Sequence, residues 1–224
     1  MTFQASNSKS RIFKVIASAF FIFTLVISDA THAKGNPEAG KSKSATCVTC
    51  HGPDGNSIIQ LYPKIAGQHD NYLLKTLLAY QALSTNPQSD KATHKSANAG
   101  IMNAQVAQLS QQDLEDLVAY YSSQKMSMGE TSAQSYDLGR KLYLGGDLER
   151  GIPACAACHS PTGTGNYPAM FPRLAGQQSE YIKAQLLAFK SDERLNDMMQ
   201  VLAKKLNDED IAAVSSFASG LTAK

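Results

Sequence analysis

All four cysteines of the chain lie in two copies of one five-residue pattern, Cys-x-x-Cys-His, and this repetition limits the possible folds more than any other feature. The copies run from Cys47 to His51 and from Cys155 to His159. Two cysteines three residues apart share one face of a helical turn, and the next residue places an imidazole beside them. The pattern is the attachment sequence of c-type haem, in which both thiols form thioethers and the histidine becomes an axial iron ligand. The sequence therefore predicts two covalently attached haem c groups. The predicted attachment residues are Cys47, Cys50, Cys155 and Cys158.

Two other kinds of cysteine site fit the sequence less well. A structural zinc site needs four ligands at one centre, whereas these two pairs lie about a hundred residues apart and each is already followed by histidine. A thioredoxin-like redox motif is expected once, near a strand and helix crossover. Here the motif is duplicated and its flanks indicate helix and loop, which favours haem.

The first 33 residues have the pattern of a secretory signal peptide. Three basic residues precede an uncharged apolar run from Val15 to Ile27, and small residues follow at 28–33. This run is shorter than the roughly 20 residues that span a bilayer, although an uncleaved N-terminal anchor is the alternative. We expect cleavage after Ala33 or Ala30 and localisation in an oxidising bacterial periplasm, where covalent haem attachment fits a secreted chain.

The charge of the chain changes when this leader is removed. The whole sequence has 21 basic and 19 acidic residues. Of these, three basic residues and one acidic residue lie in residues 1–33. The remainder is therefore formally neutral before haem propionates are considered. The basic character of the precursor gives no support for nucleic-acid binding.

The chain is an internal duplication that extends beyond the cysteines. The segment from Pro63 to Gln68 recurs from Pro172 to Gln177, at an offset of 109 residues. We predict two domains at 34–125 and 135–224, joined by a polar linker at 126–134. Each domain has about 90 residues, which is small for an independent apolar core, so we expect its haem to complete the core.

Short polar residues mark the expected helix starts in both halves, and strand signals are almost absent, so the predicted fold class is all-α. The first helix of the chain is expected to run into Cys47, and its counterpart in the second half to extend through Tyr143. The final helix of each half begins with a capping-box pattern. The expected starts, in chain order, are Asn36, Asp70 or Asn71, Ser110, Ser135, Ser179 and Asn207.

Two methionines are candidates for the second axial ligands. When the halves are aligned on their final helices, Met102 and Met199 each lie seven residues before a leucine and eleven before an aspartate. A single methionine at helical spacing is more often core filler, but two matched positions downstream of a haem histidine favour ligation. Met198 competes with Met199, since a one-residue change of register would select it. His69 and His94 are rival ligands in the first half only, because neither has a histidine counterpart in the second.

These ligands predict electron transport rather than catalysis. An iron that binds one histidine and one methionine has no coordination position left for a substrate. We therefore expect single electrons to pass by outer-sphere transfer through a haem edge, with no enzyme activity. The alternative is a haem enzyme, or the redox subunit of a periplasmic dehydrogenase, with one open iron site.

Taken together, the motifs resemble the two-haem cytochrome c4 family. The resemblance rests on the tandem Cys-x-x-Cys-His motifs, the Pro-x-[Ile/Leu]-Ala-Gly-Gln segment after each, and the methionine followed by Leu-x-x-x-Asp in each half. It implies two tandem class I cytochrome c domains, each wrapped around one haem. It also implies that the carbonyls of Pro63 and Pro172 accept hydrogen bonds from His51 and His159. The implied partners are a bc-type quinol-oxidising complex as donor and a haem-copper terminal oxidase as acceptor, with loose association at the membrane surface.

Overall fold

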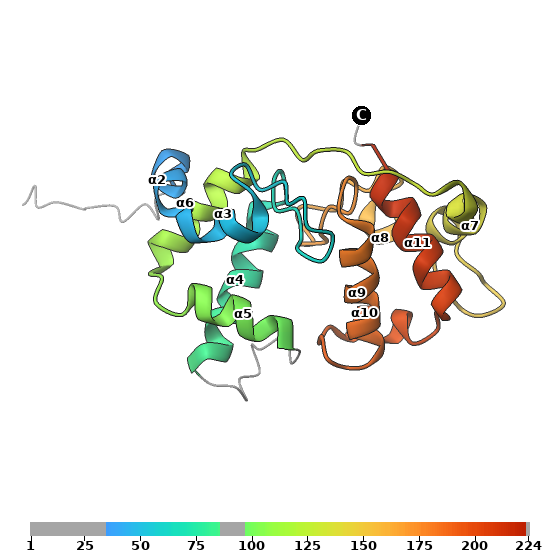
Figure 1. The fold of residues 1–224 in the computed structure, drawn as a ribbon. Coiled ribbons are helices and arrows are strands. Elements are labelled where there is room, and N and C mark those ends of the chain that lie inside the picture. Colours follow the sequence, from blue (N-terminus) through green and yellow to red (C-terminus); the bar gives the residue numbers. More distant parts are fainter. Residues whose placement is uncertain (1–34, 86–96, 223–224) are drawn as a thin grey trace, which may run out of the picture. The chain divides into compact units, whose positions relative to one another are not determined.

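The computed structural model describes residues 35–85 and 97–222, and helices make up nearly all of their regular structure (Figure 1). The expected signal peptide and His94 lie outside the described residues. Within them, the only strand-type pairings are two isolated bridges, Asp147 with Ile152 and Asn166 with Phe171. The all-α prediction is therefore confirmed.

The helices follow the same order in both halves of the chain. The first half contains α2 (Pro37–Lys43), α3 (Ala45–His51), α4 (Asp70–Thr85), α5 (Ala97–Val106) and α6 (Gln111–Ser122). The second contains the short 3-10 turn η1 (Ala133–Ser135) and then α7 (Tyr136–Gly145), α8 (Ala156–His159), α9 (Ser179–Lys190), α10 (Asp197–Ala203) and α11 (Asp208–Gly220). After η1, each helix of the second half has a counterpart in the first.

Side-chain caps fix several of these starts. The Asn36 carboxamide accepts hydrogen bonds from the second and third residues of α2, and Pro37 occupies the first helical position. Both predicted capping boxes are present, with Ser110 and Asp113 opening α6 and Asn207 and Asp210 opening α11.

Two expectations about the first helix of each half were wrong. The helix from Pro37 does not reach Cys47. It ends at Lys43, where the Ser44 hydroxyl bonds the Lys41 carbonyl at 2.8 Å and competes with the helical backbone pattern. In the second half, Ser135 occupies the N-cap position of α7 but makes no capping hydrogen bond, and that helix continues two residues past Tyr143.

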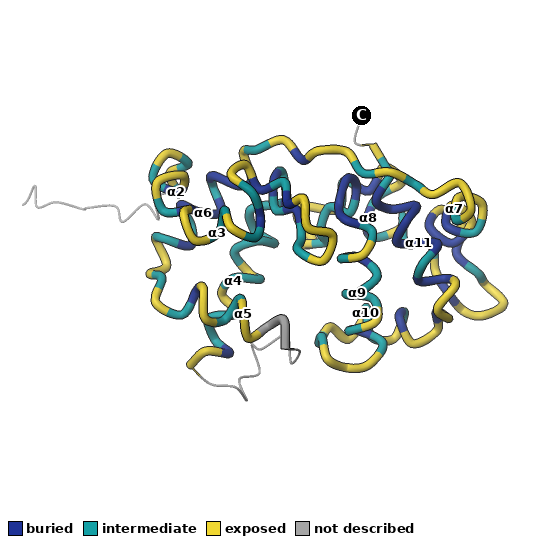
Figure 2. Tube along the Cα trace, viewed as in Figure 1, coloured by how far each residue is buried: buried dark blue, intermediate teal, exposed yellow. Residues whose placement is uncertain are grey.

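The last helix of each half packs against the first and the long middle helix. In the first half α6 contacts α2 and α4, and in the second half α11 contacts α7 and α9. Figure 2 shows that α11 is buried over most of its length, with an unbroken buried run from Ala213 to Ser219. The two main apolar clusters lie along these contacts, and one cysteine of each haem motif packs against a cluster.

The expected linker is less separate from the domains than its composition suggested. Its first residue, Met126, is only 4% exposed, although Met128 is 68% exposed. Met126 lies against two glycines of the repeated segment, Gly67 and Gly176, which both have positive φ and no room for a side chain. The Lys64 Nζ also donates to the Ser127 carbonyl at 3.1 Å. The start of the linker is therefore part of the packed interior.

Candidate haem-binding sites

The first Cys-x-x-Cys-His motif forms helix α3, which presents its residues to the core of the first half. Cys47 packs against the buried cluster of Leu117, Tyr120 and Tyr121. His51 ends the helix and is only 6% exposed. Its Nδ1 lies 2.8 Å from the Pro63 carbonyl oxygen, and because a carbonyl can only accept, Nδ1 carries the proton.

The second motif repeats this arrangement in the second half. Cys155 precedes α8 and packs against a cluster that includes Tyr143 and Phe217. His159 ends α8, is 8% exposed, and places its Nδ1 3.0 Å from the Pro172 carbonyl oxygen. Each half therefore has one buried imidazole whose orientation is fixed by a proline carbonyl.

A shared loop geometry brings each proline to its histidine. The Gly55 carbonyl accepts hydrogen bonds from the backbone N–H groups of Ile65 and Ala66, at 2.8 and 3.1 Å. The Gly163 carbonyl does the same for Leu174 and Ala175, at 2.8 and 3.0 Å. These bonds tie the segment after each proline to the loop that follows the haem motif.

The electrostatic surroundings prepare both histidines to bind a metal. Burial lowers the pKa of His51 and of His159, and this outweighs the opposing effect of the proline carbonyls. The rings are therefore neutral at neutral pH, and with the proton on Nδ1 the lone pair is on Nε2, where iron binds. The residues present thus fit haem ligation.

The cysteines are free of disulfides, and their surroundings are unlike those of a redox-active dithiol. Burial raises the pKa of the Cys155 thiol to about 11 and also raises that of Cys47. Redox motifs of the Cys-x-x-Cys type instead lower the pKa of one thiol to make it reactive. Within the described parts of the chain, no group of three or more His, Cys, Asp or Glu residues could hold a metal ion. The thioredoxin-like and zinc alternatives therefore gain no support.

The candidate methionines lie on corresponding helices. Met102 is on α5 and Met199 on α10, and both side chains are partly buried. The competing Met198 is 50% exposed. The Asn196 carboxamide caps α10 by accepting from the Met199 N–H at 3.0 Å, which fixes the start of this helix. Burial thus favours Met199 over Met198.

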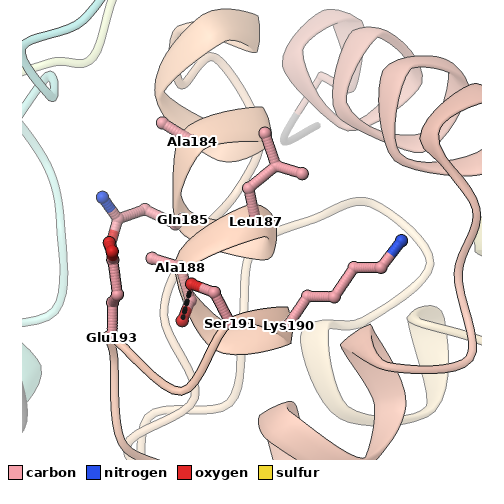
Figure 3. A pocket seen from close by; sticks show the side chains of 7 residues that line it. All are labelled: Ala184, Gln185, Leu187, Ala188, Lys190, Ser191 and Glu193. Carbon is pink, nitrogen blue, oxygen red and sulfur yellow. Dashed lines mark hydrogen bonds between the residues drawn. The ribbon is translucent and has the colours of Figure 1, made fainter.

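A hollow on the second half is lined by other residues than these. It runs along the end of α9 (Figure 3) and is lined by Ala184, Gln185, Leu187, Ala188, Lys190, Ser191 and Glu193. None of these residues belongs to a haem motif, and Lys190 donates to the Leu206 carbonyl at 2.8 Å. The hollow contains none of the predicted haem ligands.

Several side chains that join the two halves were missed by sequence reasoning. Gln68 and Gln177 each bond the backbone of the opposite half, and the Arg194 guanidinium donates to the Tyr72 hydroxyl at 2.9 Å. His69, which we did not expect at an interface, packs edge-on against Tyr167. The repetition of the glutamine in both copies of the Ala-Gly-Gln segment was the one available signal.

The fold and the paired sites define a c-type cytochrome with two haem-binding domains. Residues 37–125 and 136–222 each match the model of the cytochrome c family. Cytochrome c4 of Azotobacter vinelandii is 43% identical over 204 residues, which cover 89% of this chain and 96% of that protein. The crystal structure of reduced recombinant cytochrome c4 from Pseudomonas stutzeri matches with a TM-score of 0.78 and 44% identity, covering 84% of this chain and 100% of that chain. The chain belongs to the cytochrome c4 family.

Membership of this family establishes the cofactor and the general function. The chain carries two covalently attached haem c groups and transports electrons between protein partners. A related protein with a more specific description is the thiosulfate dehydrogenase electron acceptor of Thiomonas intermedia (strain K12). It is 32% identical over 215 residues, covering 91% of this chain and 89% of that protein. Among the described residues, no helix is both long and apolar enough to cross a membrane.

Proposed function

We propose that each haem is bound by one cysteine pair and by one histidine and one methionine. In residues 34–125, Cys47 and Cys50 form the thioethers while His51 and Met102 bind the iron. In residues 135–224, the corresponding residues are Cys155, Cys158, His159 and Met199. The observation that carries this proposal is the repeated imidazole, which is buried, neutral and held through Nδ1 by a proline carbonyl at 2.8 and 3.0 Å.

The side chains around each site suit repeated electron transfer. Haem iron supplies a one-electron change between its ferric and ferrous states. The carbonyls of Pro63 and Pro172 hold the imidazoles in one orientation, so little reorganisation is needed when the charge changes. With His51 and Met102 holding one haem, and His159 and Met199 the other, no iron position would remain for a substrate, and the thioether of each methionine would favour the ferrous state.

The proposed physiological role is to pass electrons from a bc-type quinol-oxidising complex to a haem-copper terminal oxidase in the periplasm, after removal of residues 1–33. The similarity to cytochrome c4 over most of the chain supports this role. Since residues 34–224 are formally neutral, recognition would depend on local patches and on small, transient contacts, as rapid turnover requires.

A second candidate role is to accept electrons from a periplasmic dehydrogenase. The similarity to a thiosulfate dehydrogenase electron acceptor favours it. Stopped-flow measurements of haem reduction by a purified bc-type complex, and separately by a thiosulfate dehydrogenase with thiosulfate, distinguish the two roles. Faster reduction by the dehydrogenase would replace the first proposal with the second.

The methionine ligands can be tested individually. Met102→Ala and Met199→Ala should each remove the weak near-infrared sulfur-to-iron band of one haem and lower its reduction potential. Met198→Ala is the matched control and should change neither property. Loss of the band in Met198→Ala, with an unchanged Met199→Ala, would show that the ligand register is wrong by one residue.

The absence of an open iron site can be tested with carbon monoxide. The spectrum of the reduced protein should not change when the gas is added at neutral pH. Formation of a carbonyl adduct would instead favour a haem enzyme.

A further inference from the structure

Two buried glutamine side chains cross between the haem domains in a reciprocal pattern. Gln177 and Gln68 are 4% and 5% exposed. The Gln177 Oε1 accepts from the Lys64 N–H, and its Nε2 donates to the Lys64 carbonyl, both at 2.8 Å. Gln68 makes the same two bonds to the backbone of Arg173, at 2.8 and 2.9 Å. Each carboxamide therefore satisfies both backbone groups of the residue that follows the haem-site proline in the other domain.

The position of these bonds connects each glutamine to the opposite histidine. The Lys64 N–H and the Pro63 C=O belong to the same planar peptide group. Gln177 binds the N–H end of this group, while His51 Nδ1 donates to its carbonyl end at 2.8 Å. In the other domain, the peptide between Pro172 and Arg173 joins Gln68 to His159 in the same way.

Hydrogen bonds on the two ends of one peptide group reinforce each other. When the N–H donates to an acceptor, electron density moves toward the carbonyl oxygen, which then accepts more strongly. The effect is larger in a buried site because the local dielectric constant is low. Each glutamine thus strengthens the hydrogen bond that the opposite histidine donates.

We propose that Gln177 and Gln68 are positioning residues that tune the axial histidine of the opposite domain. This inference rests on the proposed ligation by His51 and His159. A stronger acceptor at Nδ1–H makes the imidazole a more basic ligand, which stabilises ferric iron. Gln177 therefore lowers the reduction potential of the haem bound by His51, and Gln68 lowers that of the haem bound by His159.

A neighbouring glutamine provides a matched control. Gln178 is also buried and also crosses between the domains, and its Nε2 donates to the Ser57 carbonyl at 2.6 Å. That carbonyl is outside the peptide that binds His51. Gln178→Leu therefore removes one hydrogen bond across the interface and leaves the connection to the histidine intact.

The experiment compares Gln177→Leu, Gln68→Leu and Gln178→Leu in the full dihaem protein. Nitrogen-15 NMR of the diamagnetic ferrous form reports the Nδ1–H proton of each axial histidine. Gln177→Leu should move the His51 proton upfield, and Gln68→Leu should do the same for His159. At a fixed ambient potential, the ferric-to-ferrous ratio of the affected haem should fall by up to about twofold, because losing its cooperative partner weakens the hydrogen bond of the histidine by only about 10–30%.

The direction of the effect can be checked with a second variant that keeps the acceptor oxygen. In Gln177→Glu, the second oxygen faces the buried Lys64 carbonyl in the place of Nε2, so the group should be the protonated acid, which donates there while its other oxygen accepts from the Lys64 N–H. A neutral acid is a weaker acceptor than an amide, so the His51 Nδ1–H proton should move upfield by less than in Gln177→Leu. This variant also keeps the proposal testable if the leucine variant does not fold.

The crossed pattern of shifts separates tuning from a purely structural role. If Gln177→Leu and Gln68→Leu each shift both haems equally, or if Gln178→Leu produces the same shifts, the glutamines only hold the domains together and the proposal is wrong. Failure of the ligation itself would be visible in the unmodified protein, since the His51 ring protons would then lack the large ring-current shifts of an axial ligand.

Discussion

Asp113 has two roles at the start of α6. It completes the capping box with Ser110, and it forms an ion pair with Lys43 of α2 at 2.7 Å. Lys43 also pairs with Asp116 at 2.6 Å, so one lysine joins the first and last helices of this domain. The hydrogen bond from Lys43, assisted by Ser110, lowers the pKa of Asp113 from 3.8 to about 2.

This ion pair predicts a pH-dependent loss of stability. A carboxyl group with a lowered pKa in the folded state contributes stability above its unfolded pKa and loses that contribution as the pH falls through the folded value. Lys43→Met should therefore lower the free energy of unfolding at neutral pH. The difference from the unmodified protein should shrink as the pH falls from about 4 to about 2, as urea unfolding would measure.

Lys41→Met is the control for this experiment, because Lys41 is exposed on the same helix. Its effect on stability should be small and should not change across this pH range. A constant difference for Lys43→Met over the same range would contradict the prediction.

At the scale of helices, the N-caps of α11 and α7 differ in a way that their sequences do not reveal. Asn207 accepts from the Asp210 N–H at 2.8 Å, whereas Ser135 makes no capping bond. Asn207→Ala should lower the free energy of unfolding by about 1 kcal/mol, and Ser135→Ala by less than about 0.5 kcal/mol. Urea unfolding of the reduced protein measures both.

Asn207→Asp tests whether the cap is responsible. Aspartate keeps an acceptor oxygen and should retain most of the lost stability. Equal losses for Asn207→Ala and Ser135→Ala would show that the capping bond makes no special contribution.

At the scale of the whole molecule, Met126 gives the expected linker a packing role. It is buried against Gly67 and Gly176, one from each copy of the repeated segment. Met126→Ala should lower the free energy of unfolding by about 2–5 kcal/mol, because it leaves a cavity in a packed region. Thermal or urea unfolding, followed by circular dichroism, measures this loss.

Met128→Ala is the matched control two residues further along the same linker. Its side chain is 68% exposed, so the change should stay within about 0.5 kcal/mol. If both alanine variants had equally small effects, residues 126–134 would be a simple spacer, as the composition suggested.

The successes and failures of the sequence predictions have a common physical cause. The haem motifs, the capping boxes and the starts at Asp70 and Ser179 depend on residues close together in the chain. The burial of Met126 depends on glycines about 50 to 60 positions away, and the bonds of Gln68 and Gln177 depend on residues more than a hundred positions away. No local pattern specifies the approach of such distant residues. The prediction that the first helix would run into Cys47 failed for another reason. The Ser44 hydroxyl, within one turn of the Lys41 carbonyl, competes with the helical backbone for it, and α2 ends early.

The reciprocal glutamine bonds also affect how the protein responds to dilution. The glutamine that ends each copy of the repeated segment binds the backbone of the other copy, Gln177 at Lys64 and Gln68 at Arg173. Such reciprocal contacts are the arrangement of a symmetric dimer interface. Between separate chains, such a contact would dissociate at low concentration. Residues 126–134 join the two partners covalently, so their encounter is intramolecular and independent of protein concentration. The pairing of the two haem domains should therefore persist however sparsely the protein is distributed.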